Sequence, residues 1–462
     1  MDCINMATDS HGRSTFARGV HPPESKHLTQ DKPIEPGPPV GELSILLSQH
    51  IGAPCQPAVQ KGDLVEAAQK VGECQAFVCA PVHAPVAGKV KEVALRSHPV
   101  LGRCQAIVLE PGELAPPALP SFSLPAGFDP ARYSPQEICE AVRDAGLVGM
   151  GGAGFPTSVK IQPDAKPPKH TLLVNGCECE PYITCDYRLM LEWTDQVLAG
   201  IRLAQRACGA SKVFVGIEDN KPRAIEVIGD AIKRAGLSSD IRVVSLQTKY
   251  PQGGERQLIN AVLGQTVPTG GIPPMIGVVV VNVATAAAIA DAVIYRRPLT
   301  HRVVTVTGEA VAKPGNYYVA IGTPVEALLE FCGGVTEKSA KVVMGGPMMG
   351  LAIADLSTPI TKTSGAVTVL TRHQIGQAKF ERRQTACIRC GRCLEVCPEN
   401  LNPTRIAHAV KANLLDVAER HFISACIECG CCSYVCPANI ELTGYIKTGK
   451  IFLARQRKKM PA

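Results

Sequence analysis

The sequence predicts a multidomain α/β protein that ends in a cysteine-rich helical domain, and three observations lead to this prediction. A chain of 462 residues is too long for one hydrophobic core, so several folding units are expected. In the middle of the chain, short valine-rich runs alternate with helical patterns, which is typical of a mostly parallel sheet covered by helices. Near the end, two cysteine-rich phrases, at residues 386–400 and 425–439, repeat almost letter for letter.

The cysteine phrases both obey the pattern C-x2-C-x2-C-x3-C-P. Thiolates at this spacing hold three corners of a [4Fe-4S] cubane, while the fourth cysteine ligates the other cluster. Structural zinc sites use two C-x2-C pairs separated by a longer loop, so zinc is the weaker interpretation. Cys431 falls outside the spacing and is expected to be a spectator. The first cluster is assigned to Cys387, Cys390, Cys393 and Cys436, and the second to Cys426, Cys429, Cys432 and Cys397.

The composition limits the classes of protein to which the chain can belong. A net charge of +7 without a basic stripe and interleaved aromatics does not favour nucleic-acid binding. The polar N-terminus is not a hydrophobic leader, so the twenty cysteines indicate a reducing compartment and metal binding rather than disulfides. The cysteines outside the motifs are interpreted as scattered buried thiols, namely Cys3, Cys55, Cys74, Cys79, Cys104, Cys139, Cys208 and Cys332.

One apolar stretch, residues 276–295, could be mistaken for a membrane span. It contains Asn282, Thr285 and Asp291, and a central Asp costs about 2.5–3.5 kcal/mol on insertion scales. We therefore interpret residues 278–281 as a buried strand that runs into an alanine-rich helix. The chain is expected to be soluble or at most peripheral to a membrane.

Residues 1–40 are expected to form an extended lead-in, because they are rich in Pro and His and lack periodicity. Residues 41–112 show short strand patterns and resemble the barrel-sandwich module of biotinyl and lipoyl carriers, with Lys89 near a tight turn. Modification of Lys89 remains an alternative, but the flanking residues favour an unmodified domain. After a Pro-rich bridge, residues 130–299 predict the α/β domain and residues 300–370 a β-grasp-like insert. Residues 371–454 form the two-cluster domain.

A glycine-rich segment at residues 146–160, "GLVGMGGAGFPTSVK", is the second chemical signature. Glycines this close together leave the backbone bare, so amide groups are free to approach a phosphate or a flavin ring. The segment does not match G-x-G-x-x-G between a strand and a helix, and a merely flexible loop is the alternative. The candidate cofactor-binding residues here are Gly149, Gly151, Gly152, Gly154, Phe155 and Lys160.

Three polar stretches, "NGCECEP", "YPQGGE" and "NVAT", each follow an apolar run and should emerge at the ends of strands, where open α/β sheets bind ligands. Asparagine amides suit an isoalloxazine edge, a lysine suits the flavin phosphate, and carboxylates suit nicotinamide and ribose hydroxyls. Alternatives are a solvated lysine, an acidic pair that lines a turn, and a metal site at Cys177, Cys179 and Cys185. The further candidates are Asn175, Glu178, Glu180, Gly253, Gly254, Glu255, Asn282 and Thr285.

These features together indicate electron transfer. A nicotinamide exchanges two electrons at once, whereas an iron–sulfur cluster exchanges one, so FMN is expected between NAD(H) and the clusters. No acid–base pair for another substrate is evident. A soluble flavin and iron–sulfur oxidoreductase with its own organic substrate, and a binding protein with structural clusters, are the rival interpretations.

The order of the motifs resembles that of the FMN- and NADH-binding subunit of respiratory complex I. The chain departs from that family at four positions, where Met150 replaces an arginine and Cys177, Gly254 and Ala284 replace acids. With "GVHPP", the carrier-like module and the two-cluster end, these departures resemble the C subunits of Rnf electron transport complexes, over residues 16–453.

The Rnf resemblance implies a peripheral subunit on the cytoplasmic side of the cell inner membrane, in a complex that couples ferredoxin and NAD redox chemistry to ion translocation. The implied partners are a ferredoxin-like B subunit, integral membrane subunits and, indirectly, ferredoxin. The β-grasp insert would then be of the SLBB type.

Overall fold

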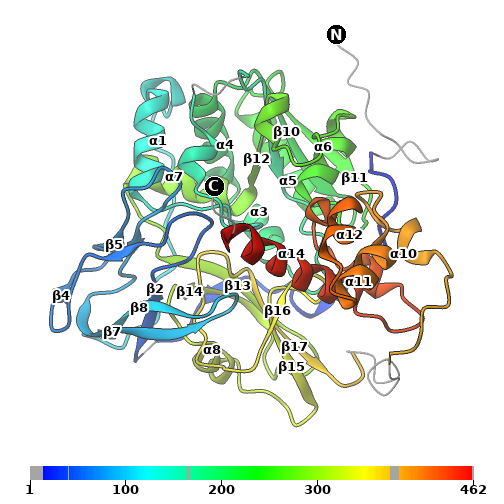
Figure 1. The fold of residues 1–462 in the computed structure, drawn as a ribbon. Helices are drawn as coiled ribbons and strands as arrows, with labels where there is room; N and C mark the ends of the chain where they lie inside the picture. The colour runs from blue at the N-terminus through cyan, green and yellow to red at the C-terminus, as the bar shows by residue number, and fades with distance from the viewer. Residues whose placement is uncertain (1–13, 40, 164–166, 375–383, 460–462) are drawn as a thin grey trace.

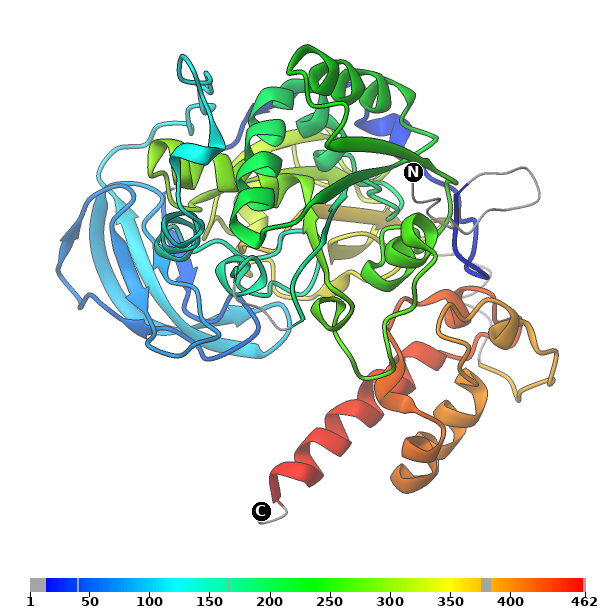
Figure 2. The ribbon, with the colours of Figure 1, turned by 90° about the horizontal axis from the view of Figure 1, so that it is seen from above.

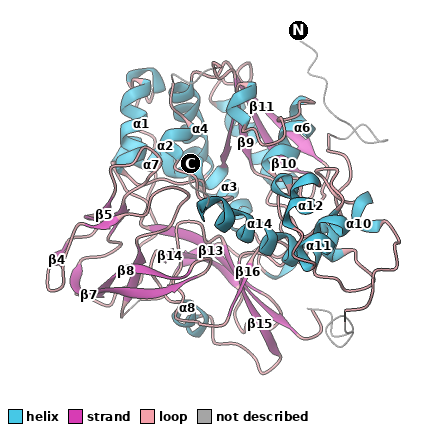
Figure 3. Ribbon diagram, in the orientation of Figure 1, coloured by secondary structure: helices cyan, strands magenta, loops and turns pink. Residues whose placement is uncertain are grey.

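The structure is a computed structural model that describes residues 14–39, 41–163, 167–374 and 384–459. Its described strands form four sheets. The β module and the helices α10 to α12 lie on opposite sides of the α/β domain (Figure 1). Most helices gather on one side of the molecule, and the β module and the β-grasp sheet form a strand-rich side (Figure 3). The expected multidomain α/β class is confirmed.

The β module consists of two small sheets packed face to face, as the barrel-sandwich prediction requires. Their core contains Leu43, Val71 and Ile107. Lys89 is exposed and lies within a strand, paired with Leu64 and Glu110, rather than at a hairpin tip. The first sheet contains β2 (Leu43–Leu46), β8 (Gly102–Pro111), β7 (Gly88–His98) and β4 (Leu64–Val65), and the second contains β3 (Gln56–Pro57), β5 (Lys70–Glu73) and β6 (Val82–His83).

The α/β domain is built on a parallel sheet in the order β11-β10-β9-β12. Its strands are buried on both faces, because successive residues such as Leu172 and Leu173 point to opposite faces and enter two different hydrophobic cores. The chain moves from β9 outward to β11 and then returns to the other side of β9, so the topological switch point lies between β9 and β12. The strands are β9 (Thr171–Asn175), β10 (Lys212–Glu218), β11 (Ile241–Leu246) and β12 (Val278–Asn282).

Helices cover both faces of this sheet. On one face α1 begins with a capping box in which Ser134 and Glu137 satisfy each other's backbone amides. The other face is covered by α6. The helices are α1 (Pro135–Asp144), α2 (Thr157–Lys160), α3 (Cys185–Glu192), α4 (Thr194–Cys208), α5 (Pro222–Arg234), α6 (Glu255–Leu263) and α7 (Val283–Tyr295).

The alanine-rich apolar stretch forms the buried strand β12 followed by α7, as predicted. Among the described residues, no helix has both the length and the apolar character needed to cross a membrane.

The β-grasp insert is a mixed sheet in the order β1-β14-β13-β17-β15-β16, with one helix packed against it. Strand β13 pairs antiparallel with β14 and parallel with β17. Val304, Leu328 and Val367 are fully buried between sheet and helix. The elements are β13 (His301–Thr307), β14 (Gly315–Ala320), α8 (Val325–Phe331), β15 (Ser339–Met344), β16 (Leu351–Ile353) and β17 (Ala366–Thr371).

The described part of the lead-in, residues 14–36, is called here the N-terminal strap. It contains a short turn, η1 (Lys26–Leu28), and an edge strand, β1 (Ile34–Pro36), which pairs parallel with β14. It also bridges β11 and the loop after it through Ser14 and Val20. Gly19 of the strap also donates to Val396 of the C-terminal domain, so the strap contacts three domains, which the lack of periodicity did not predict.

The C-terminal domain is helical, and α14 packs against α11 and α12. Figure 2 shows α14 running outward from the cluster domain to the C-terminal end. Ile406, Ala418 and Ile446 are almost fully buried in its core. The elements are α10 (Arg392–Glu395), α11 (Pro403–Lys411), α12 (Leu415–Arg420), η4 (Ile423–Ala425), α13 (Cys431–Tyr434) and α14 (Leu442–Lys459).

Candidate functional site

Two asparagines end the strands on either side of the switch point, and Asn175 pairs with Asn282 in the sheet register. The amide of Asn175 donates to the carbonyl of Gly253 at 2.8 Å. The side-chain oxygen of Asn282 caps α7 by accepting from the backbone amides of Ala284 and Thr285, at 2.8 and 3.3 Å. Both asparagines are therefore held rigidly at the place where open α/β sheets bind ligands.

The glycine-rich segment lies at the same edge of the sheet. A Cβ atom at Gly151 would lie 2.7 Å from the Asn282 amide nitrogen, so only glycine fits at this distance. The Met150 amide donates to the Thr285 hydroxyl at 3.0 Å, which ties the segment to α7. Gly152 is exposed, and a Cβ there would meet nothing within 4 Å. This bare stretch of backbone can receive a flat ring.

The segment closes on itself beyond this point. The Gly149 amide donates to the carbonyl of Phe155 at 2.9 Å, and Gly154 adopts a φ of +72° that favours glycine. The predicted glycines thus form one closed loop, which we call the glycine loop (residues 149–155).

Lys160 and Glu255 were predicted to contact different parts of a ligand, but here they contact each other. The Lys160 ammonium lies 3.0 Å from the Glu255 carboxylate and donates to the carbonyl of Val280 at 3.1 Å. Both side chains are partly exposed. A phosphate group at this position would compete with Glu255 for the ammonium.

The loops "YPQGGE" and "NGCECEP" pack closely together. A Cβ at Gly253 would lie 3.2 Å from the Cys179 sulfur and 3.3 Å from the Cys177 Cβ atom. Gly254 is the N-cap residue of α6. Two of the three predicted polar stretches therefore meet beside Asn175, and the third joins them through the pairing of Asn175 with Asn282.

The carboxylates of the two glutamates in "NGCECEP" accept hydrogen bonds from backbone amides. Glu178 accepts from the amides of Asp186 and Tyr187, at 2.7 and 3.3 Å, at the start of α3. Glu180 accepts from Met348 and Met349, at 3.2 and 2.8 Å. Burial raises the pKa of Glu178 to about 7 and also raises that of Glu180. This is the arrangement expected if the acidic pair lines a turn, and a role toward nicotinamide stays a prediction.

The alternative metal site at Cys177, Cys179 and Cys185 does not form as a group. Among the described residues, the potential ligand atoms that gather at this place belong to Glu178, Cys185 and Asp186. Asp186 also accepts from the Asn282 amide at 2.6 Å, so it belongs to the wall of the crevice.

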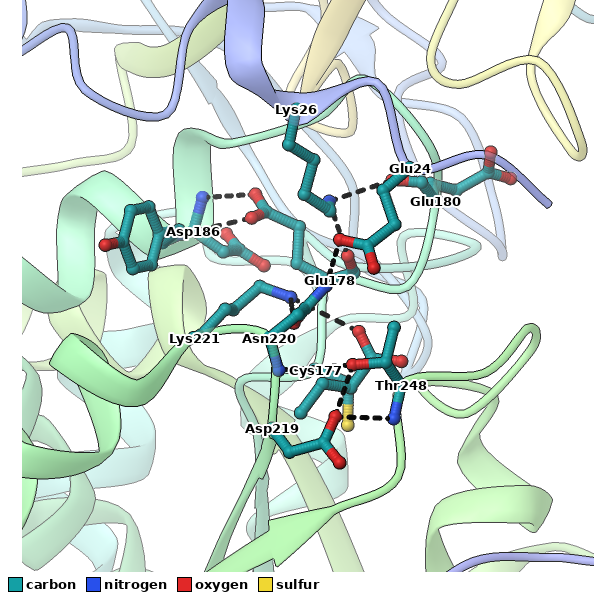
Figure 4. A network of polar contacts seen from close by, with 12 residues as sticks. Glu24, Lys26, Cys177, Glu178, Glu180, Asp186, Asp219, Asn220, Lys221 and Thr248 are labelled. Carbon is teal, nitrogen blue, oxygen red and sulfur yellow. Dashed lines mark hydrogen bonds and ion pairs between the residues drawn. The ribbon is translucent and has the colours of Figure 1, made fainter. Parts of the chain in front are cut away.

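Sequence reasoning missed a buried lysine in the N-terminal strap. Lys26 reaches from the strap toward Glu178 (Figure 4). Its ammonium donates to the carbonyls of Glu178, Glu180 and Ile183, at 2.8, 3.0 and 2.6 Å. It therefore holds the "NGCECEP" loop in shape. No local signal distinguishes Lys26 from a solvated lysine, because all three partners lie far away in the sequence.

A buried ion pair lies beneath this loop. The Lys221 ammonium is 3.2 Å from the Glu218 carboxylate, and both side chains are nearly fully buried. Burial raises the pKa of Glu218, and Lys221 opposes that rise by its charge. The pair stands at the carboxyl end of β10, next to β9, and supports the floor of the crevice.

The cluster domain contains a cavity beside the second cysteine phrase. Its lining includes all four cysteines that the spacing assigns to the second cluster, Cys397, Cys426, Cys429 and Cys432. Cys431 lines the same cavity, and the four assigned thiols are a donor set that suits a [4Fe-4S] cubane. Of the first set, Cys387, Cys393 and Cys436 share one buried cluster of side chains, whereas Cys390 is exposed.

The two cysteine phrases make matching contacts to their sulfur atoms. The Cys393 sulfur lies 3.0 Å from the Thr404 hydroxyl, and the Cys432 sulfur lies 3.5 Å from the Thr443 hydroxyl. The fourth sulfurs, of Cys397 and Cys436, accept from backbone amides four residues later, at 3.4 and 3.5 Å. Hydrogen bonds of this kind tune cluster potentials.

The crevice and the cluster domain are in direct contact. The Tyr250 hydroxyl donates to the carbonyl of Cys429 at 2.8 Å, and the Gln257 amide donates to the Glu399 carboxylate at 2.7 Å. Cys431 is fully buried in the same contact. The loop that borders the crevice therefore also borders the second cluster cavity.

This fold and site define a class: redox proteins in which a flavin- or nucleotide-binding α/β domain is joined to a two-cluster ferredoxin-type domain. Comparison with family models matches this division of the chain. The matches are the RnfC barrel sandwich hybrid domain at residues 14–113, the Nuo51 FMN-binding domain at 142–291, the SLBB domain at 303–352 and the 4Fe-4S dicluster domain at 383–440.

Comparison with curated proteins identifies the family. The chain is 43% identical to the C subunit of a proton-translocating ferredoxin:NAD(+) oxidoreductase complex of Clostridium ljungdahlii, over 88% of this chain and 87% of that protein. It is 41% identical to the C subunit of a Na(+)-translocating complex of Acetobacterium woodii, over 88% and 90%. The chain belongs to the family of C subunits of ion-translocating ferredoxin:NAD(+) oxidoreductase complexes, the Rnf type.

A solved structure shows the same fold. A chain of an NAD+-reducing [NiFe]-hydrogenase in the air-oxidized state matches with a TM-score of 0.51 and 22% identity. The match covers 70% of this chain and 62% of the hydrogenase chain.

Proposed function

We propose that this chain is the NAD-linked oxidoreductase subunit of an ion-translocating complex and that it transfers electrons between NAD(H) and two [4Fe-4S] clusters. The observation that carries the proposal is the hydrogen bond from Tyr250 to Cys429, because it joins the nucleotide crevice to the second cluster cavity. A crevice alone or clusters alone would not require this contact.

The crevice fits FMN, judged from its own geometry. Gly151 lies where a Cβ would strike Asn282, and a Cβ at Gly152 would meet nothing within 4 Å, so the glycine loop offers bare backbone at these two positions. When bound, FMN converts the two-electron chemistry of nicotinamide into the one-electron chemistry of the clusters. The residues proposed to hold it are Gly149, Gly151, Gly152, Gly154, Phe155, Lys160, Asn175, Asn282 and Thr285.

The chain's own residues position the reactants. Asn175 and Asn282 are fixed by their hydrogen bonds and present a rigid polar edge. Lys160 is the nearby cation proposed for a phosphate, with Glu255 as its partner when no phosphate is bound. Gly253 packs beside Asn175, and Gly254 is the N-cap residue of α6. Lys26 fixes the loop that carries Glu178 and Glu180, the two acids proposed to face the nucleotide.

The second cluster is proposed as the first to exchange electrons with the crevice. Cys429 contacts Tyr250 directly, whereas no contact between the crevice loops and the first-set cysteines is found among the described residues. The first cluster, with Cys387, Cys390, Cys393 and Cys436, then lies on the side from which electrons reach a partner.

The proposed partners are the other subunits of the complex, namely a ferredoxin-like B subunit and integral membrane subunits, with ferredoxin acting indirectly. The names of the curated relatives support a multisubunit setting. Large apolar side chains exposed on the cluster domain, such as Ile388 at 66% and Phe422 at 64%, support docking there. We place the chain on the cytoplasmic side of the cell inner membrane, held through these protein contacts.

The test uses the full chain with its clusters, under anaerobic conditions. Gly152→Ala adds a methyl group that meets no protein atom within 4 Å, so the protein itself should fold normally. If flavin packs on the glycine loop, this methyl group weakens FMN binding, expected to be at least tenfold by fluorescence titration, and slows bleaching by NADH. The matched control is Gly229→Ala, whose Cβ in α5 also meets nothing.

Equal FMN affinity in the Gly152→Ala variant and the control would show that FMN does not bind at the glycine loop. No flavin binding and no response to NADH by the unmodified chain would overturn the proposed function as a whole.

A further inference from the structure

Two loops at one end of the β module face each other, one between β2 and β3 and the other between β5 and β6. The Ala53 amide of the first donates to the carbonyl of Val78 in the second at 3.2 Å. Gly52 has a φ of +126°, and a Cβ there would clash with the same carbonyl oxygen. The two loops are therefore held in close contact by their backbones.

Each loop carries two side chains of the types that bind zinc. The first supplies His50 and Cys55 and the second supplies Cys74 and Cys79. The spacing places four residues between the members of each pair. The sequence pattern alone gave only scattered thiols, because the two pairs are brought together by the pairing of distant strands.

The ligand atoms are already gathered. Those of His50, Cys55 and Cys79 all lie within 4.8 Å of one another, and both of these cysteines are buried. The Cys79 thiol donates to the backbone carbonyl of Cys74 at 3.4 Å, so Cys74 is adjacent. With Zn–S bonds of about 2.3 Å and Zn–N bonds of about 2.0 Å, tetrahedral ligand atoms stand roughly 3.4–3.8 Å apart. Small side-chain rotations would close this difference.

The histidine is held in the tautomer that zinc requires. The Ala80 amide donates to the His50 Nε2 atom at 3.1 Å, so Nε2 carries a lone pair directed at the turn that contains Cys79. The Nδ1–H group then donates to the carbonyl of Ile51 at 3.2 Å, as metal-binding histidines commonly do.

A buried lysine supplies a balancing charge. The Lys362 ammonium is completely buried and donates to the carbonyls of Pro81 and Gly146, at 2.5 and 2.7 Å. Among the described residues it has no carboxylate within ion-pair distance, and the Pro81 carbonyl that it contacts lies two residues beyond Cys79 in the same loop. A zinc ion with three thiolates and one neutral histidine carries one negative charge, which Lys362 would neutralise.

We propose that His50, Cys55, Cys74 and Cys79 form a tetrahedral structural Zn²⁺ site that fastens the two loops of the β module. Binding releases the three thiol protons to solvent, and the Ala80 amide turns from Nε2 to a thiolate sulfur. The site would also support the glycine loop, because the Ile51 amide donates to the carbonyl of Gly154 at 3.3 Å. A Cβ at Gly154 would lie 3.4 Å from the His50 Cα atom, so the two segments are in contact.

The test measures zinc in the anaerobically purified full chain with its iron–sulfur clusters, after equilibration with Zn²⁺ and removal of loosely bound metal by a chelator. About one zinc per chain is expected in the unmodified chain. Cys55→Ser and Cys79→Ser should each lose at least four-fifths of it while iron content stays unchanged. The matched control is Cys104→Ser, in β8 of the same module but outside the group, which should keep its zinc.

The proposed zinc site would be refuted if the unmodified chain held no zinc. It would also be refuted if the Cys55→Ser and Cys79→Ser variants held as much zinc as the unmodified chain. Because a cysteine variant can fail to fold, X-ray absorption at the zinc edge gives a second answer on the unmodified chain. One nitrogen at about 2.0 Å and three sulfurs at about 2.3 Å are expected. A shell of four sulfurs would mean that zinc occupies a cluster motif, and it would refute the assignment of His50.

Discussion

The Tyr250 hydroxyl donates a 2.8 Å hydrogen bond to the backbone carbonyl of Cys429, and the tyrosine is only 1% exposed. A side chain from the "YPQGGE" loop therefore contacts a residue in the wall of the second cluster cavity.

Tyr250→Phe should weaken the contact without changing the shape of the side chain. Loss of one buried hydrogen bond costs about 0.5–1.5 kcal/mol, so the variant should lose its clusters at a lower temperature. The rate of cluster reduction by NADH should fall, while flavin bleaching by NADH is retained. Absorbance and low-temperature EPR measure both. Tyr133→Phe, far from the cluster domain, is the control, and equal behaviour of the two variants would contradict this role.

Cys429 and Cys431 should differ sharply although they are two residues apart. Cys429→Ser removes a proposed ligand of the second cluster and should reduce both iron content and the EPR signal by about half, since one of two clusters is lost. Cys431→Ser changes a thiol that lies in the contact with Tyr250, and iron content should stay unchanged. Loss of iron from the Cys431→Ser variant would show that the spacing assigns the wrong cysteine.

The matching hydroxyl contacts allow each cluster to be identified in a redox titration. Thr404→Val removes a hydrogen bond to Cys393 and should make the potential of the first cluster more negative. Thr443→Val should do the same for the second cluster through Cys432. Each variant is the control for the other. A shift of the same EPR signal in both variants would be inconsistent with the two ligand sets.

Glu178 should make stability depend on pH. Burial raises its pKa to about 7, above the ordinary value of 4.5, so between these pH values the folded chain keeps a proton that the unfolded chain has lost. The contribution of Glu178 to stability therefore falls as the pH rises through this window. The Glu178→Gln variant cannot ionise at this position. The melting temperature of the unmodified chain, measured relative to that of this variant, should therefore fall between pH 5 and pH 8. A difference that grows with pH would contradict the raised pKa.

The chemistry at the C-terminus could be predicted because its signal is local. The cysteine spacing alone selected Cys397, Cys426, Cys429 and Cys432, and these four line one cavity. The proximity of Asn175 and Asn282 could also be predicted, since parallel strands bring their carboxyl ends to one edge of a sheet.

Other parts of the site depend on contacts between distant residues, which a single sequence does not reveal. Lys26 looks like a surface lysine until the strap places it against three carbonyls of a loop far along the chain. The pairing of Lys160 with Glu255 likewise depends on how two loops dock. The gathering of Cys55 and Cys79 required the strand order of the β module, which no periodicity supplies.

The N-terminal strap has a consequence for how the chain is made. The amide of Gly19 donates to the carbonyl of Val396, so the strap leaves the ribosome long before this partner does. At typical translation speeds the delay is on the order of tens of seconds. During that time the Gly19 amide has no cluster domain to bind, whereas Phe16 packs on Lys249 of the α/β domain, which is made earlier. The strap therefore reaches its final contact only after the cluster domain has been made.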